Sequence, residues 1–262
     1  MWNSFRVLTD DWGAVFPRAA SRPWASIWNR LAVSTRGSST ISDLQRVASI
    51  LKAVIFDLDG TLIDSTEAIV LCFMHTFDAL GVSRPPREEV IRLIGHPLRD
   101  QFARLTDHDP DECVQVYRAR YEEVCREMTT LMPHARECLE RLRGAGFLLG
   151  FATSKKLCYS ELILKHLGIL DFFTSRIGPE EVTHPKPHPE AALKSLEHLG
   201  ARPEEAFFVG DTFFDVEAAH AAGVRCLCVT TGSESRESLL ALKPEGVFDD
   251  LCSLTSHIIE NA

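Results

Sequence analysis

The stretch of the chain best suited to chemistry carries two carboxylates directly after a short apolar run. Residues 53–56 are Ala-Val-Ile-Phe, and Asp57, Asp59 and Gly60 follow at once. A continuous apolar run with β-branched residues is typical of a strand buried on both faces of a parallel sheet. Side chains two positions apart on an extended segment point the same way, so both carboxylates can address one small volume. Ligands of open α/β sheets bind at that end of a strand, although an Asx-type turn is the simpler interpretation of Asp-x-Asp-Gly.

Three further polar clusters follow later in the chain. Thr153 and Ser154 follow the apolar segment 147–152, Lys186 lies in the Pro-rich loop 183–189, and Asp211 and Asp215 follow the apolar segment 206–210. Each has an ordinary alternative: a surface lysine for Lys186, and helix caps for the other two clusters. His184 and His188 flank Lys186 and are expected to be surface residues near the site. The recurrence of polar residues at predicted strand ends favours chemistry over a turn at Asp57.

The elements that must position these clusters alternate along the chain. Predicted strands lie at 53–56, 147–152, 172–177, 206–210 and 224–229, predicted helices at 134–144, 157–167, 189–199 and 214–222, and a last strand–helix pair within 246–260. Strands separated by helices indicate βαβ units. The fold class predicted is therefore α/β, with a doubly wound, Rossmann-like parallel sheet as its core.

A helical insertion interrupts this alternation after the first strand. Apolar spacing predicts helices at 66–80, 87–94, 97–105 and 110–128, with Asp109-Pro110 as a helix start. We therefore predict a catalytic core formed by 51–64 and 133–262 and a helical bundle, or cap, formed by 65–132.

The first 50 residues differ from the rest. They hold all four Trp, eight Ser, and six Arg against three Asp, with no apolar period. We interpret 1–50 as an N-terminal extension that is disordered or arises from an upstream start. An organellar transit peptide is the weaker alternative because Asp10 and Asp11 are untypical of one. No catalytic role is assigned to this segment.

Charge and cysteine usage exclude several functions. The net charge is −9 although the first 50 residues are basic, so the remainder is strongly acidic, which argues against nucleic acid or an anionic membrane as a partner. The eight Cys lack the paired spacing of a zinc site and are expected to be reduced in a cytoplasmic protein. No apolar run reaches the ~18 residues that span a membrane.

In their order, the four clusters resemble the motifs of the haloacid dehalogenase superfamily over residues 51–260. The inserted bundle is similar to the phosphoglycolate-phosphatase-like group with an α-helical cap. The resemblance implies a Mg²⁺-dependent phosphatase that hydrolyses a small phosphorylated metabolite through an aspartyl phosphate. It implies that Asp57 is the nucleophile and that Asp59 acts as acid and base. It implies that phosphate is bound by Thr153, Ser154 and Lys186. The Mg²⁺ ligands would be Asp57, Asp211 and the backbone carbonyl of Asp59, with Asp215 in a supporting place.

These residue types suit that reaction. Uncatalysed hydrolysis of a phosphate monoester is so slow that an enzyme must supply up to ~10²¹-fold acceleration. A covalent intermediate splits the reaction into two easier steps. An anionic nucleophile that attacks an anionic phosphoryl group needs positive charge beside it, which Mg²⁺ and Lys186 would provide.

Several alternatives stay open from the sequence. The same motifs occur in phosphoryl transferases of the sugar-phosphate mutase type and in inorganic pyrophosphatases of the superfamily, and a binding protein on an inactive scaffold is a third class. Ser154 stands where Asn is frequent, whereas Asp59 argues against a dehalogenase. Arg99, after the break at 94–97, would contact a second anionic group of a compact ester, or is an exposed helix arginine. A monomer or homodimer is expected.

Overall fold

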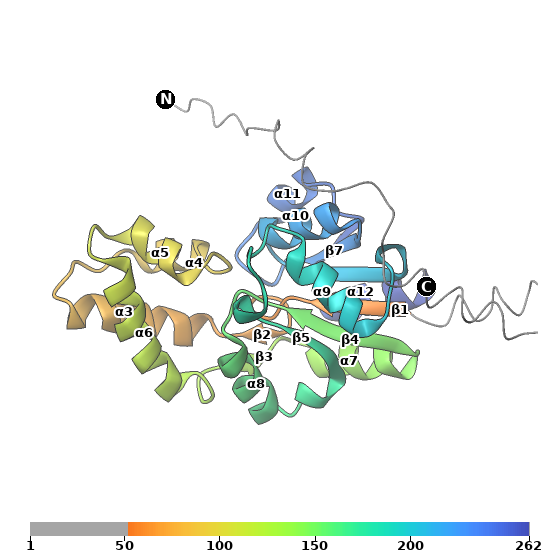
Figure 1. The fold of residues 1–262 in the computed structure, drawn as a ribbon, viewed down its shortest axis with the longest axis horizontal. Coiled ribbons are helices and arrows are strands. Elements are labelled where there is room, and N and C mark those ends of the chain that lie inside the picture. Colours follow the sequence, from red (N-terminus) through yellow and green to blue (C-terminus); the bar gives the residue numbers. More distant parts are fainter. Residues whose placement is uncertain (1–51, 262) are drawn as a thin grey trace, which may run out of the picture. The chain divides into compact units, whose positions relative to one another are not determined.

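The predicted parallel sheet is confirmed by the computed structural model, which describes residues 52–261 (Figure 1). The strands β1 (Lys52–Phe56), β4 (Phe147–Ala152), β5 (Phe173–Ile177), β6 (Ala206–Gly210), β7 (Arg225–Val229) and β8 (Gly246–Phe248) pair in parallel, in the order β5-β4-β1-β6-β7-β8. The strand order reverses beside β1, which makes the carboxyl end of β1 the expected ligand position. The predicted extension 1–50 lies outside the described residues.

Strand β1 is buried on both faces, as its continuous apolar run predicts. Val54 and Phe56 belong to one hydrophobic cluster and Ala53 and Ile55 to another, because successive side chains alternate between the faces. The first cluster is completed by α7 (Ala135–Gly144), α8 (Leu157–His166) and α12 (Leu251–Glu260), and the second by α9 (Glu190–Leu199), α10 (Phe213–Ala222) and α11 (Arg236–Ala241). Helices on both sides fix the position of the strand and of the carboxylate that follows it (Figure 1).

A helical segment follows β1, as the apolar spacing predicts. It contains α3 (Thr66–Ala79), α4 (Arg87–Arg92), α5 (Leu98–Leu105) and α6 (Pro110–Val124). Phe73 packs against Phe102 and Tyr117, with ring centroids 4.4 and 5.1 Å apart, and so joins α3, α5 and α6. Asp109 caps α6 as predicted by accepting the backbone N–H of Asp111.

Two short strands close the base of the helical segment. β2 (Ile63–Asp64) and β3 (Thr130–Leu131) pair antiparallel, before α3 and after α6. The sequence does not predict them, because two residues are too few to show a period. They explain why α6 ends at Val124 instead of residue 128: the chain must turn back over 125–129 to reach Asp64.

The remaining elements are short. The 3₁₀ helices are η2 (Leu170–Phe172), η3 (Pro179–Glu181) and η4 (Pro203–Glu205). Helix α11 is absent from the predicted helices; Ser235 is its N-cap, and the Ser235 hydroxyl accepts the N–H of Ser238. Between residues 52 and 261, no helix is both long and apolar enough to cross a membrane.

Candidate active site

Asp57 is the first residue beyond β1, and its backbone still belongs to the sheet. Its N–H donates to the carbonyl of Val209 over 2.8 Å, and only 3% of the residue is exposed. The chain then turns tightly, with the N–H groups of Thr61 and Ile63 both directed at the carbonyl of Leu58. Gly60 makes this turn possible because its φ of +83° is unfavourable for other residues.

The turn carries the first motif toward the end of β6. The hydroxyl of Thr61 donates to Asp211 Oδ1 over 2.7 Å. A Cβ on Gly60 would lie 2.3 Å from Asp211 Oδ2, so only glycine permits this approach. Asp57 and Asp211 therefore lie together at one edge of the sheet, as the sequence predicts.

Asp57, Asp211 and Asp215 form a buried carboxylate cluster, whose nearest oxygens all lie within 4.8 Å of one another. Lys186 is the ammonium inside it. Its Nζ lies 2.7 Å from Asp215 Oδ1 and 3.0 Å from Asp57 Oδ1, and the residue is 5% exposed. The interpretation of Lys186 as a surface lysine is therefore wrong.

The charges of this cluster are not balanced. Burial raises the pKa of Asp57 to about 7, with Lys186 acting against it and Asp215 and Asp59 adding to it. Burial, reinforced by Asp215 and Asp57, also raises the pKa of Asp211 well above its usual value. Burial alone would lower the pKa of Lys186, but Asp215 and Asp57 outweigh it and raise that pKa. One ammonium among three carboxylates leaves excess negative charge, which a divalent cation would offset.

A Mg²⁺ ion fits the residues of this cluster. Asp57 Oδ1 is inaccessible to solvent, and its partner among the described residues is the Lys186 ammonium at 3.0 Å. The buried carboxylates of Asp57 and Asp211 are the hard oxygen donors that Mg²⁺ prefers, and the single ammonium beside them leaves negative charge for the ion to offset. Asp215 is engaged otherwise: its Oδ2 accepts the hydroxyl and N–H of Thr212 at 2.7 and 3.0 Å, which caps α10, while its Oδ1 holds Lys186. The helix-cap alternative is thus correct for Asp215.

Asp59 is held by a residue that the sequence analysis missed. Lys155 Nζ lies 3.1 Å from Asp59 Oδ1, and its side chain is only 7% exposed. The same ammonium donates to the hydroxyl of Tyr121 in α6, and Asp59 also accepts the hydroxyl of Ser65. Lys155 therefore links the carboxylate of Asp59 to the helical segment. Its position directly after Thr153 and Ser154 was the signal available in the sequence.

Thr153 and Ser154 follow β4 and line a pocket of about 420 Å³ together with Asp57, Asp59 and Lys186. Thr153 Oγ1 accepts the N–H of Lys155 over 3.2 Å, and α8 begins later, with Lys156 at its N-cap. These two hydroxyl residues therefore do not cap α8, and the alternative interpretation of them is wrong.

The helical segment contributes the opposite wall of this pocket. Its lining there includes His96, Arg99, Arg118 and Tyr121. Arg99 is 59% exposed at the rim, where its Nε lies 3.0 Å from Asp111 Oδ1. Arg118 is half-buried and, with Lys155 and Lys156 from the sheet side, makes the pocket rich in positive charge.

The segment after β7 also reaches the site, a contact that no pattern in the sequence predicts. The hydroxyl of Thr231 donates to the carbonyl of Gly60 over 2.6 Å. A Cβ on Gly232 would lie 1.7 Å from Asp211 Oδ2, so a side chain here must displace the Asp211 carboxylate.

Gly232→Ala is therefore expected to lower kcat/KM by about 10²-fold, since a displacement near 1 Å in a catalytic group has about that effect. Steady-state kinetics at several Mg²⁺ concentrations measures the loss. The matched control is Gly144→Ala, because a Cβ there meets no atom within 4 Å. Unchanged kinetics in Gly232→Ala would show that Asp211 is not constrained by this contact.

The chain is similar to known proteins in sequence and in structure. The family model of haloacid dehalogenase-like hydrolases matches residues 54–229. Pyrophosphatase PpaX of Bacillus velezensis is 36% identical over 202 residues, which cover 77% of this chain and 94% of the relative. The match with PpaX of Bacillus cereus strain AH820 is 33% identical over 208 residues, 78% of this chain and 94% of the relative.

Solved structures share the fold. A haloacid dehalogenase-like family hydrolase from Streptococcus pneumoniae has a TM-score of 0.73 at 31% identity, covering 80% of this chain and 99% of that one. A predicted phosphoglycolate phosphatase from Haemophilus somnus has a TM-score of 0.73 at 26% identity, covering 79% and 98%. The resemblance read from the four motifs is confirmed, and this chain belongs to the family of haloacid dehalogenase-like hydrolases.

Proposed function

We propose that the protein is a Mg²⁺-dependent phosphohydrolase in which Asp57 attacks phosphorus and forms an aspartyl phosphate. The observation that carries the proposal is the position of Asp57. Its carboxylate lies at the carboxyl end of the central strand, 3.0 Å from the buried Lys186 ammonium, and lines a pocket that Thr153 and Ser154 also line. A nucleophile, a fixed cation and hydroxyl donors around one volume suit phosphoryl transfer.

Each residue has a definite part in the proposed reaction. A Mg²⁺ ion held by Asp57, Asp211 and the carbonyl of Asp59 would supply positive charge to the phosphoryl oxygens. Lys186 would hold the phosphoryl group and Asp57 in line, and Thr153 and Ser154 would donate hydrogen bonds to its oxygens.

Two proton transfers balance the reaction. As the Asp57–phosphorus bond forms, the bond to the leaving oxygen breaks and that oxygen takes a proton from Asp59. Asp59 then accepts a proton from the water that attacks phosphorus, which releases phosphate and restores Asp57. Ser65 and Lys155 hold the Asp59 carboxylate in place for both transfers.

We propose a compact anionic substrate, with a phosphoglycolate-like monoester as the first candidate. The pocket of about 420 Å³ is bounded by Arg99 and Arg118 on its helical side, which suits a second anionic group close to the phosphate. Pyrophosphate is the second candidate, and the similarity to proteins named pyrophosphatase PpaX favours it. The acidic charge makes nucleic acid an unsuitable partner, and a cytoplasmic monomer or homodimer stays a prediction.

Phosphate release from phosphoglycolate, pyrophosphate, p-nitrophenyl phosphate and a phosphopeptide, with Mg²⁺ and with chelator, tests this proposal. We expect turnover only with Mg²⁺ and the highest kcat/KM for phosphoglycolate or pyrophosphate. A preference for the phosphopeptide would contradict the compact substrate. Dependence on a bisphosphate activator would assign the protein to the phosphoryl transferases, and turnover in chelator would contradict the role of Mg²⁺.

Arg99→Ala is expected to lower kcat/KM for the anionic substrate by up to about 5-fold, because an exposed charged contact contributes roughly 0.2–1 kcal/mol, while p-nitrophenyl phosphate is affected little. Arg99 lines the pocket rim, and its partner Asp111 is exposed too, so the ion pair contributes little stability. The matched control is Arg104→Ala, an exposed arginine of the same helix α5. Equal losses on both substrates would assign Arg99 a general structural role.

A further inference from the structure

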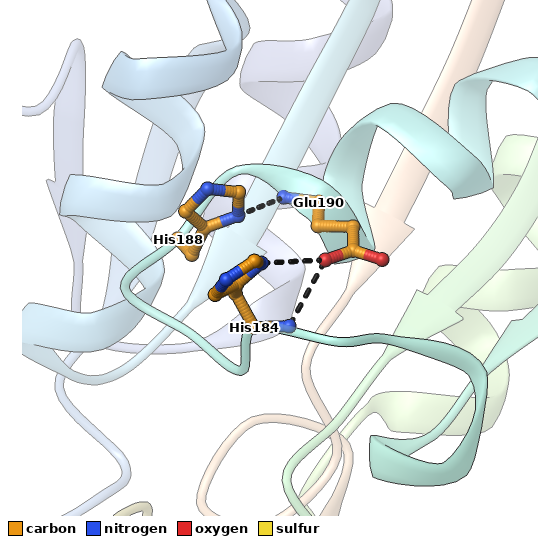
Figure 2. Close-up of side chains that lie close together, drawn as sticks. All are labelled: His184, His188 and Glu190. Atoms are coloured by element: carbon orange, nitrogen blue, oxygen red, sulfur yellow. Dashed lines mark hydrogen bonds and ion pairs between the residues drawn. The ribbon is translucent and has the colours of Figure 1, made fainter. Parts of the chain in front are cut away.

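A second group of metal-ligating side chains lies on the loop that carries Lys186. His184, His188 and Glu190 offer ligand atoms that all lie within 4.8 Å of one another. Figure 2 shows both imidazole rings and the carboxylate gathered where the loop enters α9. The proposed hydrolysis uses none of these three residues.

The distances within this His/Glu cluster suit a transition metal. His184 Nδ1 lies 3.3 Å from Glu190 Oε2 (Figure 2). Two ligands that bind zinc at ~2.0–2.1 Å with tetrahedral angles lie ~3.3 Å apart, so this pair already has the separation of one edge of such a site. The rings of His184 and His188 have centroids 4.6 Å apart, and each ring offers a nitrogen within 4.8 Å of the other ligand atoms.

The loop holds these ligands in a restricted geometry before any ion binds. The Glu190 carboxylate accepts the N–H groups of Thr183 and His184 at 3.0 and 2.9 Å. The N–H of Thr183, the Lys194 ammonium 3.0 Å from Glu190 Oε1 and the N–H of His184, in that order, lower the pKa of Glu190 to about 2. Pro185, Pro187 and Pro189 alternate with the intervening residues and fix φ at three positions. A loop so restricted loses less conformational freedom when it binds an ion.

We propose that His184, His188 and Glu190 bind a borderline-soft divalent cation of the Zn²⁺ class. Two imidazole nitrogens favour Zn²⁺, Ni²⁺ or Cu²⁺, whereas Mg²⁺ selects oxygen ligands such as those of the carboxylate cluster. The side chain of His184 is 63% exposed and that of Glu190 18%, so an ion can enter from solvent and keep water as its remaining ligand.

Such an ion would link the loop residues on either side of Lys186. His184 and His188 stand two positions before and after this lysine, whose ammonium is the buried cation beside Asp57. Cross-linking 184, 188 and 190 would restrain the segment that positions that ammonium. The proposal is independent of the proposed function, because binding of the ion requires no turnover.

Calorimetric titration of the full chain with Zn²⁺ tests the site. The protein carries no polyhistidine tag, and Mg²⁺ is present in large excess to occupy the carboxylate cluster. We expect one Zn²⁺ ion per chain and a higher melting temperature in its presence, because the ion binds the folded site. His184→Ala, His188→Ala and Glu190→Gln should each weaken binding by more than about 10-fold, since losing even a partner of a ligand has an effect of 10–100-fold.

His198→Ala is the matched control, because His198 is exposed on the same helix α9 but lies outside the His/Glu cluster. It should bind Zn²⁺ as the unaltered chain does. Equal Zn²⁺ affinity in His184→Ala, His188→Ala and His198→Ala would overturn the proposal. A second readout needs no variant: electron paramagnetic resonance of bound Cu²⁺ should show nitrogen couplings from imidazole ligands, and a spectrum with oxygen ligands alone would also overturn it.

Discussion

Asp57→Asn is expected to lower kcat with p-nitrophenyl phosphate by at least about 10³-fold, the scale reached when a nucleophile is removed. The amide has nearly the shape of the carboxylate but cannot form the aspartyl phosphate. The fold should persist, because Asp57 joins the sheet through its backbone N–H, which the substitution leaves in place. Steady-state kinetics with saturating Mg²⁺ and a thermal melt measure both expectations.

The matched control is Asp107→Asn, which makes the same chemical change at an exposed position between α5 and α6. Its kinetics should equal those of the unaltered chain. Activity of Asp57→Asn above about a thousandth of the unaltered rate would remove Asp57 from the role of nucleophile.

Asp211→Asn is expected to change stability in opposite directions with and without Mg²⁺. In chelator, the variant removes a buried carboxylate whose ionisation is opposed by burial and by Asp215 and Asp57. The Thr61 hydroxyl can still donate to the amide oxygen of the new side chain. We therefore expect a melting temperature a few degrees higher, since 1 kcal/mol corresponds to roughly 2–4 °C in a domain of this size.

With Mg²⁺, the unaltered chain should have the higher melting temperature. The unaltered chain gains stability from the bound ion, whereas the variant lacks one anionic ligand and gains less. Its kcat/KM should fall by about 10²-fold or more, with part of the loss recovered at high Mg²⁺. A variant that is destabilised in chelator and stabilised by Mg²⁺ like the unaltered chain would contradict the placement of the ion at Asp211.

The strand ends of this fold were predictable because their side chains follow simple rules. The run 53–56 is apolar throughout since both faces of β1 are covered, and Asp57 comes directly after it. The same pattern placed Thr153 after β4 and Asp211 after β6. Parallel strands bring these ends to one edge, so the main members of the site could be grouped without coordinates.

Contacts made across the fold were not predictable in this way. Lys155 meets Asp59 because both follow the ends of the neighbouring strands β1 and β4, but it meets Tyr121 only because α6 lies near the end of β4, and no spacing in the sequence encodes that second contact. From the sequence, Gly232 is an ordinary loop glycine. In the structure it matters because the Asp211 carboxylate lies directly beside it and leaves no room for a side chain. Asp215 shows that two interpretations can hold together, since one oxygen caps α10 and the other binds Lys186.

Direct detection of the phospho-enzyme tests the central claim, that Asp57 carries the phosphoryl group. The unaltered chain and Asp59→Asn are mixed with p-nitrophenyl phosphate and Mg²⁺, quenched in acid and reduced with borohydride, which converts an aspartyl phosphate to homoserine. Asp59→Asn should accumulate more of it, because the water that cleaves the intermediate has lost its base while p-nitrophenolate leaves without an acid. Peptide mass spectrometry should locate homoserine at position 57. Homoserine at position 59, or none in either protein during turnover, would contradict the assignment of Asp57 as the nucleophile.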